Sequence, residues 1–78
     1  ARDPKLAEAL HVRGRAFLGK KDPQTALDDL AEAIALEPGN YEFRVSRGLA
    51  NRGAKKDPEA LADFTAAIRL DPARATGY

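Results

Sequence analysis

The feature that most constrains this chain is an internal repeat of 34 residues. Pro4, Pro38 and Pro72 follow one another at that spacing, and each comes directly after an acidic residue. When residues 7–40 are laid over residues 41–74 without a gap, 13 of 34 positions are identical. Unrelated segments of ordinary composition would agree at roughly two or three positions. Self-similarity at a fixed period of this length is typical of repeat architectures, in which each unit buries its apolar face against the next.

Each unit is predicted to hold two helices, because apolar residues recur at spacings of three and four. The predicted helices span residues 5–20, 23–36, 41–54 and 58–70. Asp22-Pro23 and Asp57-Pro58 each have the form of an N-cap followed by proline at the first helical position. The second pair stands 35 residues after the first, which predicts that one residue has moved from the second helix to the first. The fold class is therefore all-α, with tandem helix-turn-helix repeats forming an α-solenoid segment.

Composition excludes several kinds of site. The chain has 13 basic and 12 acidic residues, a net charge of +1, which favours neither nucleic acid nor an anionic membrane surface. It has no cysteine and a single histidine, so neither a metal site nor another cofactor is predicted. No apolar run approaches the roughly 20 residues that a membrane span needs. Because no initiator methionine or signal peptide is visible, Ala1 is not expected to be the natural start, and the compartment stays unassigned.

The residues at fixed places in each unit resemble the tetratricopeptide repeat. Its pattern places a large residue, a leucine-glycine pair, an aromatic residue, an alanine, a second large residue and a closing proline at set spacings. The first unit supplies Leu10, Arg13-Gly14, Phe17, Ala26, Leu30 and Pro38, and the second supplies Arg44, Arg47-Gly48, Asn51, Ala60, Phe64 and Pro72. In this pattern the small residues let paired helices approach closely, while Leu30 and Phe64 fill the space between them.

The resemblance implies a fragment of a longer array. Residues 1–6 would be the tail of a preceding repeat and the start of the first helix, residues 7–40 and 41–74 the two repeats, and residues 75–78 the start of a following repeat. It also implies two equivalent ion pairs, Arg13–Asp29 and Arg47–Asp63, one within each repeat. Arg44 and Asn51 depart from the family pattern, which makes the packing of the second repeat weaker, and Tyr41 and Phe43 are expected to cover the seam with the first.

The family resemblance further implies a ligand on the concave face formed by the first helix of each repeat. The matching positions are Glu8, His11, Arg15, Leu18, Glu42, Val45, Leu49 and Arg52. They predict a mildly basic groove with apolar patches, suited to an extended or helical peptide that carries an acidic group. A solvated surface, or one covered by neighbouring repeats, is the alternative. The lysine and asparagines with which some chaperone adaptors hold a terminal carboxylate are absent, since His11, Arg15 and Ser46 stand at those places.

His11 is expected to be a solvated side chain, with no serine or cysteine paired with it for nucleophilic catalysis. The function predicted from these features is a non-enzymatic protein-interaction scaffold. The alternatives are a regulatory or substrate-presenting repeat region of a larger enzyme, RNA binding, which the charge balance disfavours, and self-association through uncovered repeat ends.

Overall fold

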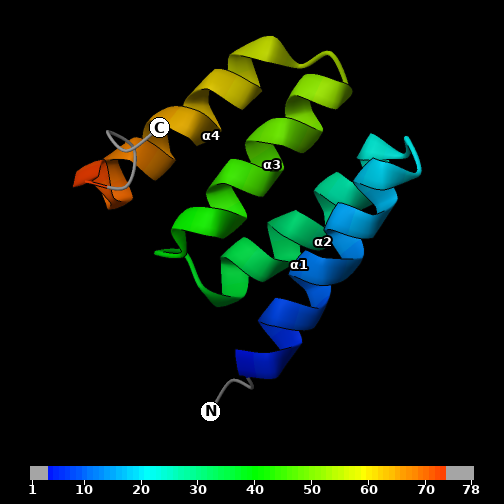
Figure 1. Cartoon of the computed structure of the whole chain (residues 1–78), viewed down its shortest axis with the longest axis horizontal. Helices are drawn as coiled ribbons and strands as arrows, with labels where there is room; N and C mark the ends of the chain where they lie inside the picture. Colours follow the sequence, from blue (N-terminus) through cyan, green and yellow to red (C-terminus); the bar gives the residue numbers. More distant parts are fainter. Residues whose placement is uncertain (1–3, 74–78) are drawn as a thin grey trace.

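The computed structural model describes residues 4–73, which form four α-helices (Figure 1). These are α1 (Pro4–Gly19), α2 (Pro23–Leu36), α3 (Tyr41–Gly53) and α4 (Asp57–Leu70). The predicted all-α class is confirmed, and each predicted helix is present with its ends within one residue of the expected ones. Residues 1–3 of the predicted leading tail and residues 75–78 of the predicted following repeat lie outside the described residues.

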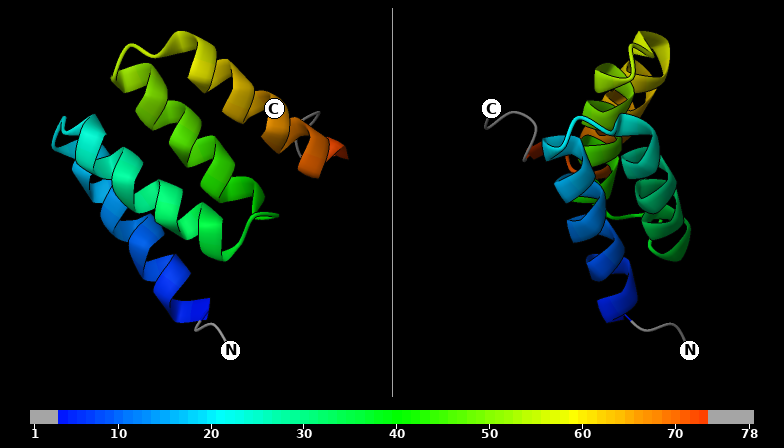
Figure 2. Two further views of the ribbon diagram at one scale, coloured as in Figure 1. Left: turned by 180° about the vertical axis from the view of Figure 1, so that it is seen from behind. Right: turned by 90° about the vertical axis from the view of Figure 1, so that its right-hand side faces the viewer.

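The helices form two antiparallel hairpins, α1 with α2 and α3 with α4. The second hairpin joins the first through α3, which contacts both α2 and α1. In Figure 1 α1 lies in front of α2, and in the reversed view of Figure 2 α2 lies in front, so the first hairpin has two layers. This arrangement gives α3 a central place, because it packs on α4 within its own repeat and on both helices of the other repeat.

The turn inside each hairpin keeps the 34-residue period, and here the sequence prediction was wrong. Lys21 and Lys55 both have positive φ, 61° and 63°, at equivalent places. The next residue is the N-cap in each case, Asp22 for α2 and Lys56 for α4. The second Asp-Pro pair therefore lies inside α4 as its first two residues, and no residue has moved between helices. Of these two N-cap residues only Asp22 caps its helix through its side chain, which accepts a hydrogen bond from the Thr25 amide at 3.3 Å.

Two apolar clusters hold the hairpins together. Phe43 of α3 packs into a cluster with residues of α1 and α2, namely Ala7, Leu10, Ala33 and Ile34. Ala50, two turns along α3, packs on Ala26, Leu27 and Leu30 of α2. The expected role of Phe43 at the seam between repeats is thus confirmed.

Small residues permit close packing within each hairpin. A Cβ added at Gly14 would lie 3.0 Å from Leu30 Cγ, and one added at Gly48 would lie 2.6 Å from Phe64 Cε1. These approaches are tighter than ordinary van der Waals contacts between carbon atoms. Leu30 and Phe64 therefore fill the space beside the glycines, as the repeat pattern predicts.

Both predicted ion pairs form, but they are not equivalent. Arg13 binds Asp29 through two hydrogen bonds of 2.8 Å, and its guanidinium lowers the pKa of the Asp29 carboxyl. Arg47 binds Asp63 with its Nη2 at 2.7 Å, and Asn51 donates a further hydrogen bond of 2.8 Å to the same carboxylate. The Arg13 side chain is 63% exposed and the Arg47 side chain 27%. The departure at Asn51 thus adds a buried amide to the network of the second repeat.

Candidate functional site

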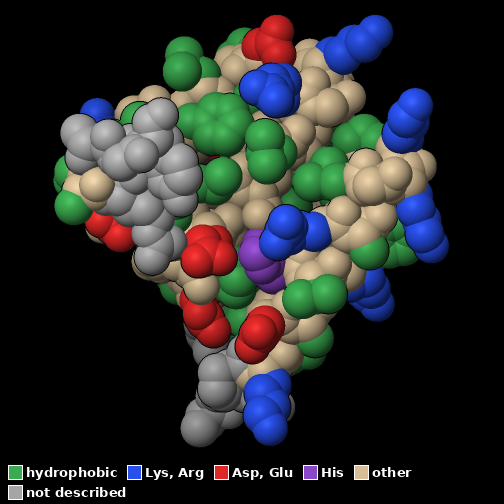
Figure 3. Space-filling view, in the orientation of Figure 1, with side chains coloured by type: hydrophobic (Ala, Val, Ile, Leu, Met, Phe, Trp, Pro, Cys, Tyr) green, Lys and Arg blue, Asp and Glu red, His purple; other side chains and the backbone are tan. Residues whose placement is uncertain are grey.

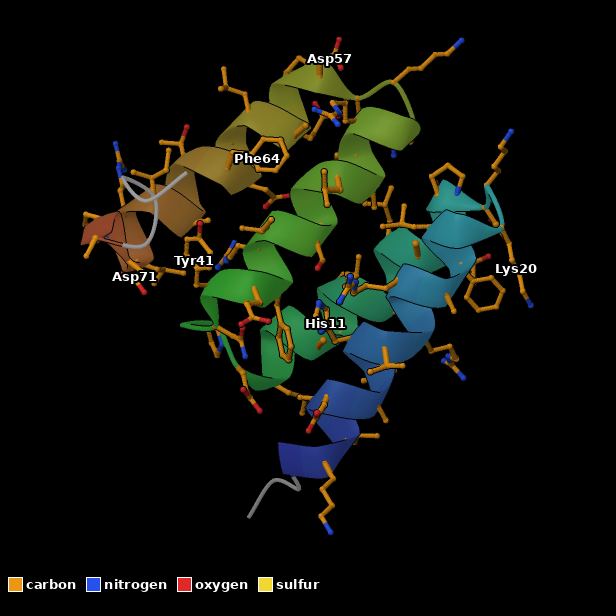
Figure 4. All side chains as sticks on the ribbon, in the orientation of Figure 1. His11, Lys20, Tyr41, Asp57, Phe64 and Asp71 are labelled. Carbon is orange, nitrogen blue, oxygen red and sulfur yellow. The ribbon has the colours of Figure 1, made fainter. Side chains whose placement is uncertain are left out.

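A groove of about 610 Å³ crosses α1, α3 and α4 on the face shown in Figure 3. The one histidine of the chain lies near the centre of this face, beside a basic side chain and several acidic ones. In Figure 4 His11, Tyr41 and Phe64 mark the three helices that bound it. The groove is lined by His11, Arg15, Tyr41, Glu42, Val45, Ser46, Leu49, Phe64, Ala67 and Ile68.

His11 is buried, with 7% of its surface exposed, so the expectation of a solvated histidine was wrong. Its Nε2 lies 2.6 Å from the Oγ of Ser46, and its ring lies 4.7 Å from the Phe43 ring, measured between centroids. Burial and the nearby Arg15 cation lower the pKa of His11, while Glu42 and Glu8 partly oppose the shift. The side chain is therefore neutral at pH 7 and joins α1 to α3.

Ser46 is likewise a partner that the sequence prediction excluded. A serine within hydrogen-bond reach of a histidine is the geometry of an activated nucleophile. Here, however, both side chains are buried, each 7% exposed, between the two repeats. Both residues also line the groove, and their hydrogen bond joins α3 to α1.

The predicted ligand-binding residues divide into three groups. His11, Arg15, Glu42, Val45 and Leu49 come together along the groove. Glu8 lies beyond its edge in an adjoining hollow of about 570 Å³, which His11 and Glu42 also line. Leu18 packs half-buried against the cluster around Leu30, and Arg52 is exposed away from the lining residues.

Sequence reasoning missed the contribution of α4, which supplies Phe64, Ala67 and Ile68 to the groove. The signal that could have found them is the repeat itself. Their counterparts 34 residues earlier are Leu30, Ala33 and Ile34. In the first repeat these residues are buried where α3 packs, and Ile34 is 6% exposed, whereas Ile68 is 51% exposed. The α4 side of the groove is therefore the second repeat's copy of the α2 surface that receives α3 in the first.

Sequence relatives agree with this architecture. No protein-family model matches the chain, and no solved structure matches it. Small glutamine-rich tetratricopeptide repeat-containing protein 2 of Saccharomyces cerevisiae is 32% identical over 92% of this chain. Tetratricopeptide repeat protein 34 of Mus musculus is 35% identical over 85% of it.

The chain belongs to the tetratricopeptide repeat family. Its two hairpins, its period and its small residues at Gly14 and Gly48 all fit that assignment. Serine/threonine-protein phosphatase 5 of Mus musculus is also similar, 35% identical over 95% of this chain. The chain spans 21% of the yeast relative's length, 12% of the first mouse protein's and 15% of the phosphatase's.

As a tetratricopeptide repeat module the chain is a protein–protein interaction unit. Residues 4–73 contain no group of three His, Cys, Asp or Glu side chains that could hold a metal ion. None of the helices within that range is long and apolar enough to cross a membrane. The groove instead combines an apolar floor with one cation, Arg15, and one carboxylate, Glu42. Such a lining can bind side chains of another protein.

Proposed function

We propose that the groove across α1, α3 and α4 binds a helical segment of a partner protein. The observation that carries the proposal is the correspondence between Val45, Phe64, Ala67 and Ile68 and their counterparts in the first repeat. Those counterparts hold one face of α3. Ala33 and Ile34 pack with Phe43, and Leu30 packs with Ala50. His11 contacts both Phe43 and Ser46. A surface that repeats this arrangement suits another helix with a large apolar residue at one turn and a small residue at the next.

The charges of the groove define a second feature of the partner. Arg15 is exposed and has no salt-bridge partner among the described residues. An acidic side chain on the bound helix would pair with it, and a guanidinium can hold a carboxylate through two hydrogen bonds. Because Glu42 lies in the same groove, a segment with several acids would meet repulsion. A helix with one acid beside its apolar residue is the best fit.

Of the remaining predicted contacts, only Glu8 extends this proposal. Glu8 lies in the hollow that adjoins the groove, where it would meet a basic residue of a longer segment. Leu18 and Arg52 lie outside the lining residues, so we assign them no contact with this ligand.

Selection from a library of random displayed peptides, with the chain immobilised, tests the proposal. Selected peptides should share an aromatic or large aliphatic residue and an acidic residue at helical spacing. Arg15→Glu and Leu49→Glu should each weaken their binding at least tenfold, about 1.4 kcal/mol. Arg52→Glu is the matched control, because it makes the same charge change on an exposed residue outside the groove. Circular dichroism checks that each variant keeps its helices. Equal losses in Arg52→Glu and Arg15→Glu, or peptides with strand-like alternation, would contradict the proposal.

A second candidate function is that of a regulatory repeat region in a larger enzyme. The observation that favours it is the similarity to serine/threonine-protein phosphatase 5, which extends over 95% of this chain but 15% of that protein. The measurement that decides is the sequence of the gene encoding the chain. A catalytic domain in the same reading frame would support this candidate, and an array of repeats alone would exclude it.

A further inference from the structure

Arg44 is the departure from the repeat pattern that the packing does not explain. The same position in the first repeat is Leu10, which is 6% exposed and packs among apolar residues. Arg44 places a guanidinium at that point, and its Nε is buried without a hydrogen-bond partner in the described part of the chain. A buried donor left unpaired is costly, because it has lost its water and gained no acceptor. Folding alone gives no reason for this residue, since the first repeat folds with leucine in its place.

Arg44 lines a groove of about 590 Å³ along the outer side of α4, and a second arginine, Arg69, lines it too. The other lining residues are Pro38, Pro58, Leu61, Ala62, Thr65, Ala66 and Leu70. None of these described residues is acidic, and none of them lines the groove across α1, α3 and α4. We call this surface the Arg44 groove.

The two repeats differ in charge along this surface, although they share one backbone. At the positions of Arg44 and Arg69 the first repeat has the apolar residues Leu10 and Ala35. At the positions of Ala62 and Ala66 it has the acids Asp28 and Glu32. The second repeat thus gains two cations and loses two carboxylates on the same face. Both changes raise the local positive potential, which attracts an anion.

We propose that the Arg44 groove is an anion-binding site that takes an oxyanion, carboxylate or phosphoryl, carried by a protein segment with apolar residues beside it. An oxyanion would accept from the buried Arg44 Nε and pair with the Arg69 guanidinium. Leu61 and Leu70, which are 67% and 43% exposed, and the two prolines would contact the apolar neighbours. Nucleic acid fits less well, because none of the described residues that line the groove is aromatic, so a base has no ring to stack on. The site is independent of the helix-binding groove described above.

Arginine Nε–H signals in ¹H–¹⁵N NMR spectra test the site directly. The probes are inorganic phosphate and acetate, added at constant ionic strength against chloride, and they distinguish the phosphoryl from the carboxylate source. The Arg44 signal should move along a saturating curve with one or both anions. Arg69→Gln should weaken that binding at least tenfold, whereas Arg52→Gln, an exposed arginine elsewhere, should leave it unchanged.

Arg44→Leu supplies a second measurement, because it restores the residue of the first repeat and should keep the fold. Phosphate or acetate should raise the unfolding midpoint of the wild-type chain more than that of Arg44→Leu, since a ligand that binds the native state stabilises it. General salt effects act on both proteins equally and cancel in this comparison. A linear, chloride-like shift of the Arg44 signal, or equal stabilisation of wild type and Arg44→Leu, would overturn the proposal.

Discussion

His11 of α1 and Ser46 of α3 form a buried hydrogen bond across the two repeats, with 2.6 Å between Nε2 and Oγ. The Phe43 ring lies against the same imidazole, so an apolar and a polar contact fix the position of α3 at one point. The two residues are 35 positions apart in the chain. This contact connects the repeats directly and lies at the edge of the proposed helix-binding groove.

Ser46→Ala should destabilise the chain by about 1–3 kcal/mol, because it leaves a buried imidazole nitrogen without its partner. Urea denaturation followed by circular dichroism measures the loss. Ser46→Thr keeps the hydroxyl group and is therefore the control in which the hydrogen bond to His11 can still form. A loss of less than about 0.5 kcal/mol in Ser46→Ala would show that the hydrogen bond contributes little to the junction.

His11 should also make stability depend on pH. Its pKa is lowered in the folded chain by burial and by Arg15, and Glu8 of α1 and Glu42 of α3 only partly oppose this. As the pH falls, His11 therefore takes up a proton in the unfolded chain near its ordinary pKa of 6.5, before it does so in the folded chain. The contribution of neutral His11 to the free energy of unfolding is fully present above that pH. It is lost as the pH drops toward the pKa of His11 in the folded chain. Urea midpoints between pH 7.5 and 5 should show this slope in the wild type, and His11→Gln should flatten it. An unchanged slope in His11→Gln would assign the effect to other groups.

Removal of the two ion pairs should lower the free energy of unfolding by different amounts. Asp29→Asn removes the charge facing an exposed arginine, and a loss of about 1 kcal/mol or less is expected. Asp63→Asn disturbs a carboxylate that holds both Arg47 and the buried Asn51, so a loss of about 3 kcal/mol is expected. Urea denaturation of both variants under one condition makes the comparison. Equal losses would mean that Asn51 adds nothing to the network.

Gly48→Ala should destabilise the chain, because the added Cβ would lie 2.6 Å from Phe64 Cε1 and the ring would have to move. Overpacking of this kind costs about 1–3 kcal/mol, and the better helix propensity of alanine offsets up to about 1 kcal/mol. Gly19→Ala is the control, since no heavy atom outside its own surroundings lies within 4 Å of the added Cβ. The thermal midpoint should fall in the first variant and stay level or rise in the second. A higher thermal midpoint in both variants would show that the Phe64 ring moves aside at little cost in stability.

Lys56→Ser should stabilise α4 by about 1 kcal/mol, because serine at the N-cap can accept a hydrogen bond from the first turn. Lys56 makes no such bond at present, whereas Asp22 does so at the equivalent end of α2. Asp22→Lys is the reciprocal variant and should lose a similar amount. Denaturant midpoints of the two variants should move in opposite directions, and a shift of both in one direction would contradict the capping argument.

The sequence predicted the features that depend on neighbouring residues. The spacing of apolar side chains gave the four helices, and the small residues at Gly14 and Gly48 marked where Leu30 and Phe64 would fit. It failed at Asp57, because the Asp-Pro pattern looks the same at an N-cap and one residue inside a helix. The position of the left-handed residue Lys55 determines which of the two occurs.

The burial of a residue that lies between two helices could not be predicted from the sequence pattern of its own helix. His11 was expected to be solvated because the sequence shows no partner for it, yet α3 covers it with Phe43 and Ser46. Ile68 repeats the sequence environment of Ile34 but not its burial, since α3 packs on Ile34, whereas Ile68 lies open in the groove.

The sequence by itself determined the period, the helical class and the family of this protein. Each repeat has apolar and small residues at the fixed positions where its helices pack, so the spacing of these residues identifies the fold. Only the tertiary structure decided which polar side chains are buried in hydrogen bonds within the chain and which remain exposed. Helix periodicity specifies the face on which a side chain lies, but burial and hydrogen bonding depend on the second helix that reaches that face. For His11 that helix is α3, while Arg15, one turn further along α1, stays exposed.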